Sequence, residues 1–393
     1  MIIIPSMTGI GGSEKLVDSL SNLLSSDHQV FQATFDPPGA KRHFESDIFC
    51  FQLGPILRLP LYLRWIAFAQ LALRLSRLKR KLQIEITISN LWGADLLSVL
   101  SFGADKKISL GLINIRDNPT NRLMIKFRFF VGFVYRRFDR ILAISKPLAN
   151  ELKELYKLSD ESLGTFRNFV NTPHPRPIWS SDGVHRFVFC GRLVQEKNVD
   201  GLLYAWAEFE RAQRNVQLVV LGDGHLAASS IELAVRLQLR IGYAPSETQA
   251  SVLFLGSVNQ PEDYMAGVCA FVLSSRHEGV PTVLLLALSL NLPVLAADSN
   301  SGGIRDLLGA SSQKLTKGFL QVDAGLLLPI PEQADRETLL IWKKAFETAV
   351  SDKELHAKWT QGARSISKKY SAESVHKSWM NEIARFPSNS FFP

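Results

Sequence analysis

Residues 274–283 of this 393-residue chain read SSRHEGVPTV, and this stretch decides how the second half folds. It follows an apolar run, leads into LLLALSL at residues 284–290, and is followed by PVLAAD at residues 293–298. Short apolar runs bounded by turn residues are typical of buried strands, and a longer apolar run between two of them is typical of a helix. The stretch therefore predicts a strand, a loop, a helix over 280–290 and the next strand of an α/β sheet.

Outward from this stretch, strand and helix signals alternate along the chain, which predicts parallel sheets covered by helices on both faces. In the second half we expect strands at 185–192, 216–221, 252–256, 270–275 and 293–298, and helices near 199–213, 229–241, 261–267, 280–290 and 302–309. In the first half we expect strands at 2–7, 28–35, 84–89, 107–114, 140–145 and 163–169, and a helix at 14–25. Residues 311–324 suggest a small insertion, and the chain turns helical from Arg336.

The length predicts two domains, because 393 residues with 46% hydrophobic content exceed what one ordinary core accommodates. Residues 171–183 are rich in proline and polar residues and interrupt the alternation, so we expect an interdomain linker there. The expected domains are residues 1–170 and 184–371. Residues 372–393 are expected to form a last helix, over about 372–385, and a tail.

The three cysteines are scattered and lie in apolar runs, which indicates reduced thiols and argues against disulfides or a metal cluster. The first residues lack the basic leader of a signal peptide. The longest apolar region, around residues 61–75, is interrupted by two arginines and is too short for a membrane span. These features predict a cytoplasmic protein.

The net charge of +8 lies entirely in the first half. Residues 1–170 contain 23 Lys and Arg against 15 Asp and Glu, whereas residues 171–393 contain 22 of each. Two segments concentrate the excess: residues 54–83 hold seven cations and no acid, and residues 120–140 hold six cations against one acid.

Two motifs in the second half carry chemistry. The segment 190–198 reads CGRLVQEKN and places both Arg192 and Lys197 in the loop that follows a predicted strand. Such cations stabilise the negative charge that develops on a departing diphosphate. Glu278 stands between a strand and a helix, where backbone N–H groups and the helix dipole favour anions. In this order of motifs the chain resembles the family-4 retaining glycosyltransferases, which have two facing Rossmann-like domains, the GT-B fold. The resemblance implies that the last helix, residues 372–385, crosses back to the first domain.

The resemblance assigns roles to particular residues. It implies that Glu278 contacts the donor sugar and supports an oxocarbenium-like transition state, while Arg192 and Lys197 hold the diphosphate. It further implies a set of donor-binding residues around these three: Gly279, Val280, Pro281, Thr282 and Val283 in the same motif, and Gly256 and Val258 beside the nucleotide base. Taken alone, Glu278 could be an acidic helix cap, and the glycine turn at 222–224 could be purely structural.

The chain departs from the family pattern at position 286, where relatives have a glutamate that accepts hydrogen bonds from ribose hydroxyls. Leu286 cannot accept them. Loss of such bonds costs about 1.5–3 kcal/mol, or roughly ten- to a hundredfold in affinity. By helical spacing we expect Leu286 to share one side of the helix with Thr282 and Glu278. An inactive or partner-dependent relative is therefore the alternative within the fold.

The first half matches the family more weakly. Gly11 and Gly12 resemble its glycine loop near the transferred sugar, and Arg116 and Asn118 are acceptor-side candidates. We expect Ser145 to cap or order a turn. The 298–306 loop resembles the segment that closes over the donor, and a plain glycine loop fits it equally well.

The basic segments favour an anionic membrane surface, where the cations meet lipid headgroups and the nearby leucines enter the interface. Gln70, Arg74, Arg77 and Lys81 recur at helical spacing beside a leucine stripe at 71, 75 and 78, and the second segment interleaves cations with aromatics. An ordinary solvated helix face is the alternative. No nucleic-acid-binding motif accompanies the charge, so we expect no nucleic-acid partner.

Taken together, the sequence predicts a glycosyltransferase that uses a nucleotide sugar, UDP-linked, as co-substrate, with retention of configuration, no metal and no cofactor. The expected acceptor is a lipid-linked or membrane-proximal saccharide in bacterial surface polysaccharide synthesis. The expected location is the inner face of the cell membrane. A membrane-surface binding module on the same scaffold is the alternative of a different class.

Overall fold

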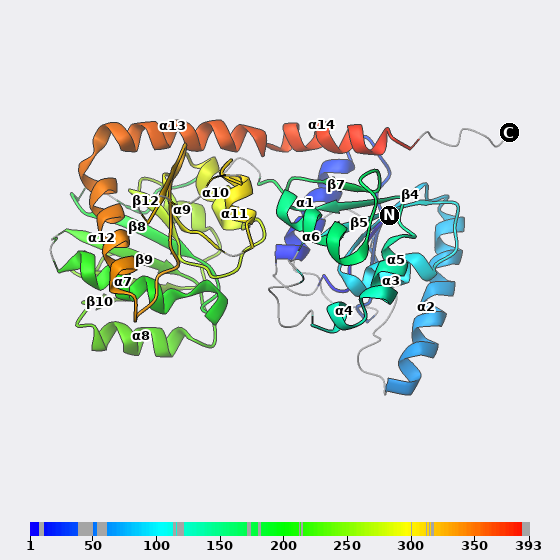
Figure 1. Cartoon of the computed structure of the whole chain (residues 1–393), viewed down its shortest axis with the longest axis horizontal. Coiled ribbons are helices and arrows are strands. Elements are labelled where there is room, and N and C mark those ends of the chain that lie inside the picture. Colours follow the sequence, from blue (N-terminus) through cyan, green and yellow to red (C-terminus); the bar gives the residue numbers. More distant parts are fainter. Residues whose placement is uncertain are drawn as a thin grey trace. The chain divides into compact units, whose positions relative to one another are not determined.

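The computed structural model describes residues 1–7, 12–37, 50–52, 61–112, 115, 122–170, 174–179, 182–211, 213, 215–299, 301–311, 313, 315 and 318–386. The chain divides into two compact units. Unit 1 comprises Met1–Asn168 and Ala372–Pro393, and unit 2 comprises Phe169–Ser371. Each unit is built from one sheet with helices beside it (Figure 1). The α/β class predicted from the alternating pattern is confirmed.

The sheet of unit 1 has strands in the order β3-β2-β1-β4-β5-β6-β7. All its pairs are parallel, with Ile2 opposite Ile88 where β1 meets β4. The strands are β1 Ile2–Ile3, β2 Gln32–Thr34, β3 Cys50–Gln52, β4 Ile86–Asn90, β5 Lys106–Gly111, β6 Arg140–Ala143 and β7 Leu163–Thr165. The strand order reverses between β1 and β4, so this is the topological switch point of the unit.

The helices of unit 1 bury apolar stripes against this sheet. They are α1 Gly12–Leu24, α2 Leu61–Lys81, α3 Trp92–Leu100, α4 Arg122–Lys126, α5 Arg128–Tyr135, α6 Lys146–Tyr156 and α14 Ala372–Ile383. Leu75 of α2 and Leu97 of α3 pack with Ile3 in one core cluster. The C-terminal helix α14 joins this unit, because Glu382 pairs with Arg140 of β6 and His376 lies 2.7 Å from Asp27.

The sheet of unit 2 has the order β10-β11-β9-β8-β12-β13-β15-β14. Its pairs are parallel except β14 with β15. The strands are β8 His185–Cys190, β9 Val216–Leu221, β10 Ile241–Gly242, β11 Val252–Gly256, β12 Ala270–Leu273, β13 Val294–Ala297, β14 Leu320–Val322 and β15 Gly325–Leu328. Here the strand order reverses between β8 and β12.

Both faces of this second sheet are covered. The helices are η2 Gln195–Lys197, α7 Val199–Glu210, α8 Ala227–Arg236, α9 Pro261–Met265, α10 Thr282–Ser289, α11 Gly303–Leu307, α12 Arg336–Ser351 and α13 Lys353–Lys369. Phe187 packs with Trp206 of α7 and Phe346 of α12 on one face, while its neighbour Val188 packs with α10 on the other. This alternation explains why the strands read as continuous apolar runs.

Several expected elements need correction. The expectation that residues 311–324 form an insertion is wrong for the last part of this range. Leu320–Val322 form strand β14, which belongs to the sheet and lies at its edge. The strands β3, β10 and β15 were not predicted, and the strand expected at 28–35 is only Gln32–Thr34. Among the helices of the described residues, none is both long and apolar enough to cross a bilayer.

Candidate active site

The sequence motifs of the second half meet at the switch point of unit 2. Arg192 and Lys197 follow β8, and Glu278 follows β12, which is the neighbouring strand. Because these strands are parallel, both loops leave the same, carboxyl edge of the sheet. Ligands of open α/β sheets bind at this edge, where the strand order reverses.

The loop that carries Arg192 is held by the glycine turn after β9. The N–H of Leu193 donates to the carbonyl of Asp223 at 2.9 Å. A Cβ on Gly222, whose φ is +141°, would lie 1.9 Å from the carbonyl oxygen of Gly191, and one on Gly224 would lie 2.3 Å from that of Leu193. The glycine turn therefore has a structural reason, which is this close backbone approach.

Arg192 itself is exposed, and its side chain makes no hydrogen bond or ion pair with any residue that the structure describes. Its guanidinium group is therefore available to an anion in solution. A planar guanidinium suits the oxygens of a phosphate because it can donate two parallel hydrogen bonds.

Lys197 and Glu278 form an ion pair across the two loops. The two side chains are only 18% and 9% exposed, so the pair is screened from water on most sides. Because little water surrounds this carboxylate and its cation, both interact strongly with charge that develops on a bound substrate. The structure thus brings two of the three predicted catalytic residues into direct contact.

Further bonds tie these two loops together. The Ser274 hydroxyl donates to the carbonyl of Lys197 at 2.9 Å, and the Arg276 N–H donates to the carbonyl of Glu196 at 2.8 Å. The buried Asn198 side chain donates to the carbonyl of Pro331 and accepts from Arg276, both at 2.9 Å. The position of the Lys197–Glu278 pair is therefore set by a network and not by the pair alone.

The helix after Glu278 begins later than expected. Pro281 is its N-cap, with Thr282 as the first residue of α10, and the N–H of Leu284 bonds back to the carbonyl of Pro281 at 3.0 Å. Glu278 therefore lies in the loop and does not share a helix face with Leu286, so that part of the spacing argument is wrong. Gly279, Val280 and Val283 are all half-buried at this helix start.

Leu286 lies one turn into α10 and is half-buried against an apolar cluster. Val258, which follows β11, and Val283 pack against the same cluster. Gly256 ends β11 with a left-handed φ of 65°, and its carbonyl accepts from the N–H of Gly222 at 2.7 Å. The position at which the resemblance implies a ribose-binding glutamate thus has apolar surroundings here.

The 298–306 loop packs directly on the Glu278 motif. A Cβ on Gly303 would lie 1.5 Å from the carbonyl oxygen of Gly279, so only glycine fits at this start of α11. Arg305 donates two hydrogen bonds of 2.6 Å to Asp298, which braces the loop.

Buried polar atoms without a partner gather at this edge. Among the described residues, the hydroxyls of Ser275 and Ser299 and Nδ1 of His277 are buried and unpaired. Such atoms are rare in folded proteins, and polar groups that bind a ligand or a water are a usual reason for them.

The first-half candidates are mostly not described. Gly11, Arg116 and Asn118 lie outside the described residues. Gly12 is the first residue of α1, is exposed, and has no atom within 4 Å of where a Cβ would stand. Ser145 is the N-cap of α6 and accepts from the N–H of Leu148, which confirms the capping role.

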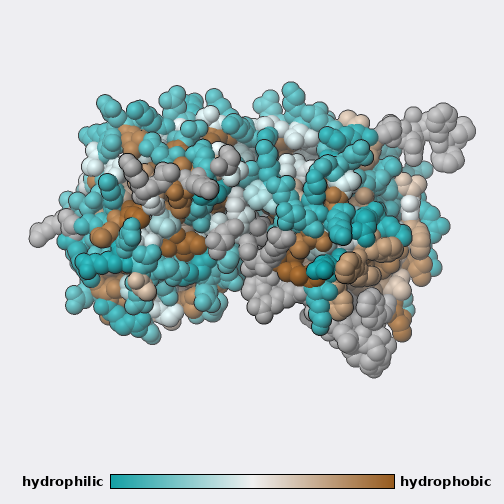
Figure 2. Space-filling model, in the orientation of Figure 1, coloured by the Kyte–Doolittle hydropathy of each residue, from teal (hydrophilic) through white to brown (hydrophobic). Residues whose placement is uncertain are grey.

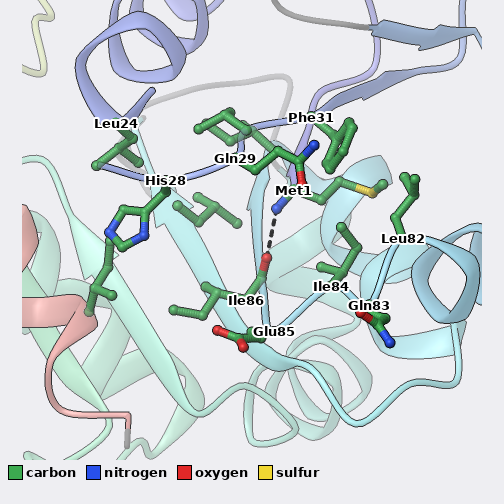
Figure 3. Close-up of a pocket in the computed structure, with 14 residues that line it drawn as sticks. Met1, Leu24, His28, Gln29, Phe31, Leu82, Gln83, Ile84, Glu85 and Ile86 are labelled. Carbon is green, nitrogen blue, oxygen red and sulfur yellow. Dashed lines mark hydrogen bonds between the residues drawn. The ribbon is translucent and has the colours of Figure 1, made fainter. Parts of the chain in front are cut away.

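A pocket of about 320 Å³ lies elsewhere in unit 1, at the amino ends of β1, β2 and β4 (Figure 3). His28 and Glu85 stand on its rim, with Leu24 and Phe31 among its apolar walls. The carboxyl edge of the sheet is at the opposite end of these strands, so this pocket is separate from the glycine loop after β1.

Sequence reasoning missed Asn198 and Arg276 as the residues that join the two loops. The one local signal at Asn198 is its place directly before α7, because asparagine is common at helix N-caps. Its actual role depends on Pro331, which is 133 residues away, and no local pattern reports such a contact.

Comparison with known proteins identifies the family. Residues 10–173 match the family model for Glycosyltransferase Family 4, and residues 184–328 match the model for Glycosyl transferases group 1. The chain is a family-4 glycosyltransferase with the GT-B fold.

Two relatives of this glycosyltransferase match most of its length. An N-acetylgalactosamine-N,N'-diacetylbacillosaminyl-diphospho-undecaprenol 4-alpha-N-acetylgalactosaminyltransferase of Campylobacter jejuni is 26% identical over 319 residues, 77% of this chain and 81% of that protein. An uncharacterized glycosyltransferase of Haemophilus influenzae is 22% identical over 94% of this chain and 95% of its own.

Solved structures show the same fold. The lipopolysaccharide outer core galactosyltransferase WaaB has a TM-score of 0.70 at 18% identity, covering 98% of both chains. Anabaena HepE in complex with UDP has a TM-score of 0.71 at 16% identity, covering 98% of this chain and 99% of that one.

Proposed function

We propose that this glycosyltransferase transfers a sugar from a UDP-linked donor to a lipid-linked or membrane-proximal saccharide, with retention of configuration and without a metal or cofactor. The setting is assembly of a bacterial surface polysaccharide. The observation that carries the proposal is the screened Lys197–Glu278 pair beside the unpaired Arg192 at the switch point of unit 2.

In the proposed reaction the bond between the sugar's anomeric carbon and the diphosphate oxygen breaks, and a bond to an acceptor hydroxyl oxygen forms. Negative charge develops on the departing diphosphate oxygen, and this oxygen takes the proton that the acceptor hydroxyl loses. Arg192 and Lys197 stabilise that charge, while Glu278 contacts the sugar hydroxyls and the positive charge on the ring. Lys197 can exchange its bond with Glu278 for one with the phosphate as the donor binds.

Relatives support the substrate classes. The name of the Campylobacter relative describes transfer to a diphospho-undecaprenol-linked saccharide. The Anabaena neighbour was solved with UDP. Another relative, which is 34% identical over 40% of this chain, is named a GDP-mannose-dependent alpha-mannosyltransferase, so GDP donors belong in any test.

Thermal-shift screening against UDP- and GDP-linked sugars tests the proposal, because a ligand that binds only the folded state raises its melting temperature. The donor that binds is then incubated without acceptor. Slow release of nucleoside diphosphate indicates a transferase, whereas a binding module on the same scaffold releases none.

An anionic membrane surface fits the charge of unit 1, and the structure changes which apolar residues would meet it. Leu71 and Leu75 of α2 are buried in the core, so the expectation that these leucines enter the interface is wrong. Arg74, Arg77 and Lys81 are exposed on the same helix.

The apolar contact instead comes from the phenylalanine patch, defined here as the exposed rings on and beside α5: Phe127, Phe129, Phe130 and Phe133. Phe129 is 74% exposed, and Arg128 lies 5.1 Å from the centre of its ring. Figure 2 shows hydrophobic surface on unit 1 in the region of α2 and α5. Both helices pack against α3. Exposed aromatics interleaved with cations suit the headgroup region of an anionic bilayer, which supports peripheral attachment at the inner membrane face.

A second candidate function rests on Leu286. Leucine has no atom that accepts a hydrogen bond from ribose hydroxyls, and the side chain packs against an apolar cluster. Both observations favour a catalytically impaired or partner-dependent relative. Donor hydrolysis separates the two, since an impaired relative would bind nucleotide weakly and release no diphosphate.

A further inference from the structure

Asn90, the last residue of β4, has an unusual environment. Its side chain is 0% exposed, and neither Oδ1 nor Nδ2 has a hydrogen-bond partner among the residues that the structure describes. A primary amide can donate two hydrogen bonds and accept two, and here none is used. Buried polar groups in folded proteins are almost always paired, so this amide requires an explanation.

The place of Asn90 in the sheet supplies one. β4 lies beside β1, where the strand order of unit 1 reverses, and Asn90 ends β4 at the carboxyl edge. This is the position at which open α/β sheets bind ligands. In unit 2 the corresponding position is between β8 and β12, where the Lys197–Glu278 pair lies.

The two faces of β4 have different partners near this edge. Ser89 donates to Asp95 of α3 at 2.6 Å, so its face is the one that α3 covers. Alternate residues of a strand point to opposite faces, so Asn90 shares the face of Ile88. Ile88 is paired with Ile2 and Ile2 with Gln32, and Gln32 donates to Ser21 of α1 at 2.9 Å, so α1 covers that face. Because α1 starts at Gly12, soon after β1, its first turn lies toward the same carboxyl edge as Asn90.

The next residue holds the end of the strand in an uncommon conformation. Leu91 has φ 74° and ψ 150°, a backbone region that residues other than glycine rarely adopt. Its carbonyl accepts from the N–H of Asp95 at 3.0 Å, which fixes the start of α3. Asn90 is therefore placed by a rigid junction and not by a bond of its own side chain.

We propose that Asn90 binds a hydroxyl group of the saccharide acceptor. A hydroxyl both donates and accepts, so neighbouring hydroxyls of a saccharide can satisfy Oδ1 and Nδ2, whereas a fully ionised phosphate group only accepts and would leave Oδ1 unpaired. This assignment rests on the proposed transferase function, in which unit 1 receives the acceptor. It makes Asn90 a binding residue of the acceptor side.

Replacement of Asn90 by leucine tests this, since leucine has a similar volume and no polar atom. Without ligand, Asn90→Leu should melt at or above the wild-type temperature, because removing an unpaired buried amide removes its desolvation penalty. The matched control is Ser98→Ala, at the far end of α3, whose buried hydroxyl is also unpaired among the described residues. Asn90→Ala serves as a second variant in case leucine does not fit.

The binding probes are methyl α-glycosides of glucose, galactose and N-acetylgalactosamine, with inorganic phosphate as a separate arm, all measured by thermal shift. We expect at least one glycoside to stabilise the wild type and Ser98→Ala equally, and to require at least tenfold more glycoside for half-saturation in Asn90→Leu and Asn90→Ala. Equal glycoside responses in all variants, a response to phosphate alone, or no glycoside response in the wild type would overturn the proposal. So would a lower melting temperature of ligand-free Asn90→Leu with an unchanged glycoside response, which indicates an ordered water.

The nucleotide-sugar screen keeps this proposal separable from the transferase function. If no nucleotide sugar binds the wild type while the glycoside difference persists, the transferase function fails alone. If nucleotide sugars bind and are hydrolysed while the glycoside responses of wild type and Asn90→Leu agree, the role of Asn90 fails alone.

Discussion

At the scale of single residues, the two cations of the candidate site in unit 2 have different surroundings. Arg192 is exposed and unpaired among the described residues, while Lys197 is held by Glu278. The two cations therefore differ: in the proposed reaction Arg192 can bind the phosphate directly, whereas Lys197 must first exchange its bond with Glu278. This difference leads to distinct expectations for the two substitutions.

Arg192→Ala and Lys197→Ala should each lower turnover by about 10² or more, because each removes a donor that stabilises the departing diphosphate. Arg192→Ala should leave the melting temperature unchanged, whereas Lys197→Ala leaves Glu278 without its cation and should lower it. Steady-state kinetics with the cognate donor measure the first effect. Arg211→Ala, which removes an exposed cation paired with Glu208 on α7, is the control. Unchanged turnover in a folded variant would remove that residue from the mechanism.

Leu286→Glu should tighten UDP binding about tenfold or more if the donor pocket still has room for a ribose-binding carboxylate. Some stability should be lost at the same time, because the apolar contacts of the leucine side chain disappear. Calorimetry with UDP measures the affinity, and Leu286→Met controls for the change in shape. Equal or weaker affinity than wild type would mean that the pocket has been rebuilt around an apolar residue.

Asp95 makes the stability of unit 1 depend on pH. Burial raises the pKa of this carboxyl from 3.8 to about 7, although Ser89 and Ser109 donate hydrogen bonds that lower it. The folded state therefore binds more protons than the unfolded state between about pH 4 and pH 7, so this group's contribution to stability falls as pH rises through that window. Below pH 4 both states are protonated and the effect disappears.

Asp95→Asn should remove this loss, because the amide keeps an acceptor for Ser89 and carries no charge. At pH 8 the free energy of unfolding of the variant should exceed that of the wild type by about 4 kcal/mol, and near pH 4 the two values should match. Urea unfolding at several pH values measures the difference. A constant difference across the range would show that Asp95 does not titrate there.

At the scale of elements, the sequence predicted long regular segments well and short or edge segments poorly. The strand at 216–221 and the helices from Arg336 onward match, because continuous apolar or periodic runs determine them. β10 has two residues and β14 pairs antiparallel at the edge, so neither produces a period that can be read. The cause of these misses is that their hydrogen bonds come from a neighbouring strand and not from their own composition.

Helix α2 shows a second limit. Its cations and leucines were correctly placed on adjoining stripes, but the leucine stripe was assigned to a membrane although Leu75 is 0% exposed and packs with Ile3. Periodicity reports that a helix has an apolar side and not what covers it. The same limit applies to the site: the sequence supplied Glu278 and Lys197, while their contact follows from the pairing of β8 with β12.

At the scale of the whole molecule, the charge is divided between the halves. The excess of +8 lies before residue 171, and the rest of the chain is balanced. Unit 2 carries the predicted donor machinery, and unit 1 carries the exposed cations and the phenylalanine patch. Electrostatic attraction to an anionic surface should therefore act mainly on unit 1.

The last prediction is that the protein floats with liposomes that contain acidic lipid at low salt, and less so as salt rises past physiological strength. Changing Arg74, Arg77 and Lys81 to serine should weaken flotation, since each cation near the surface contributes about 1 kcal/mol. Phe129→Ser with Phe133→Ser should weaken it further and reduce the part that survives high salt, because apolar insertion is not screened. The matched control changes three exposed cations of α13 in unit 2, Lys353, Lys358 and Arg364, to serine. If that control loses as much binding as the α2 variant, the attraction is nonspecific. If the wild type does not float with acidic liposomes at low salt, the proposed membrane-proximal acceptor is wrong and the acceptor is a soluble saccharide.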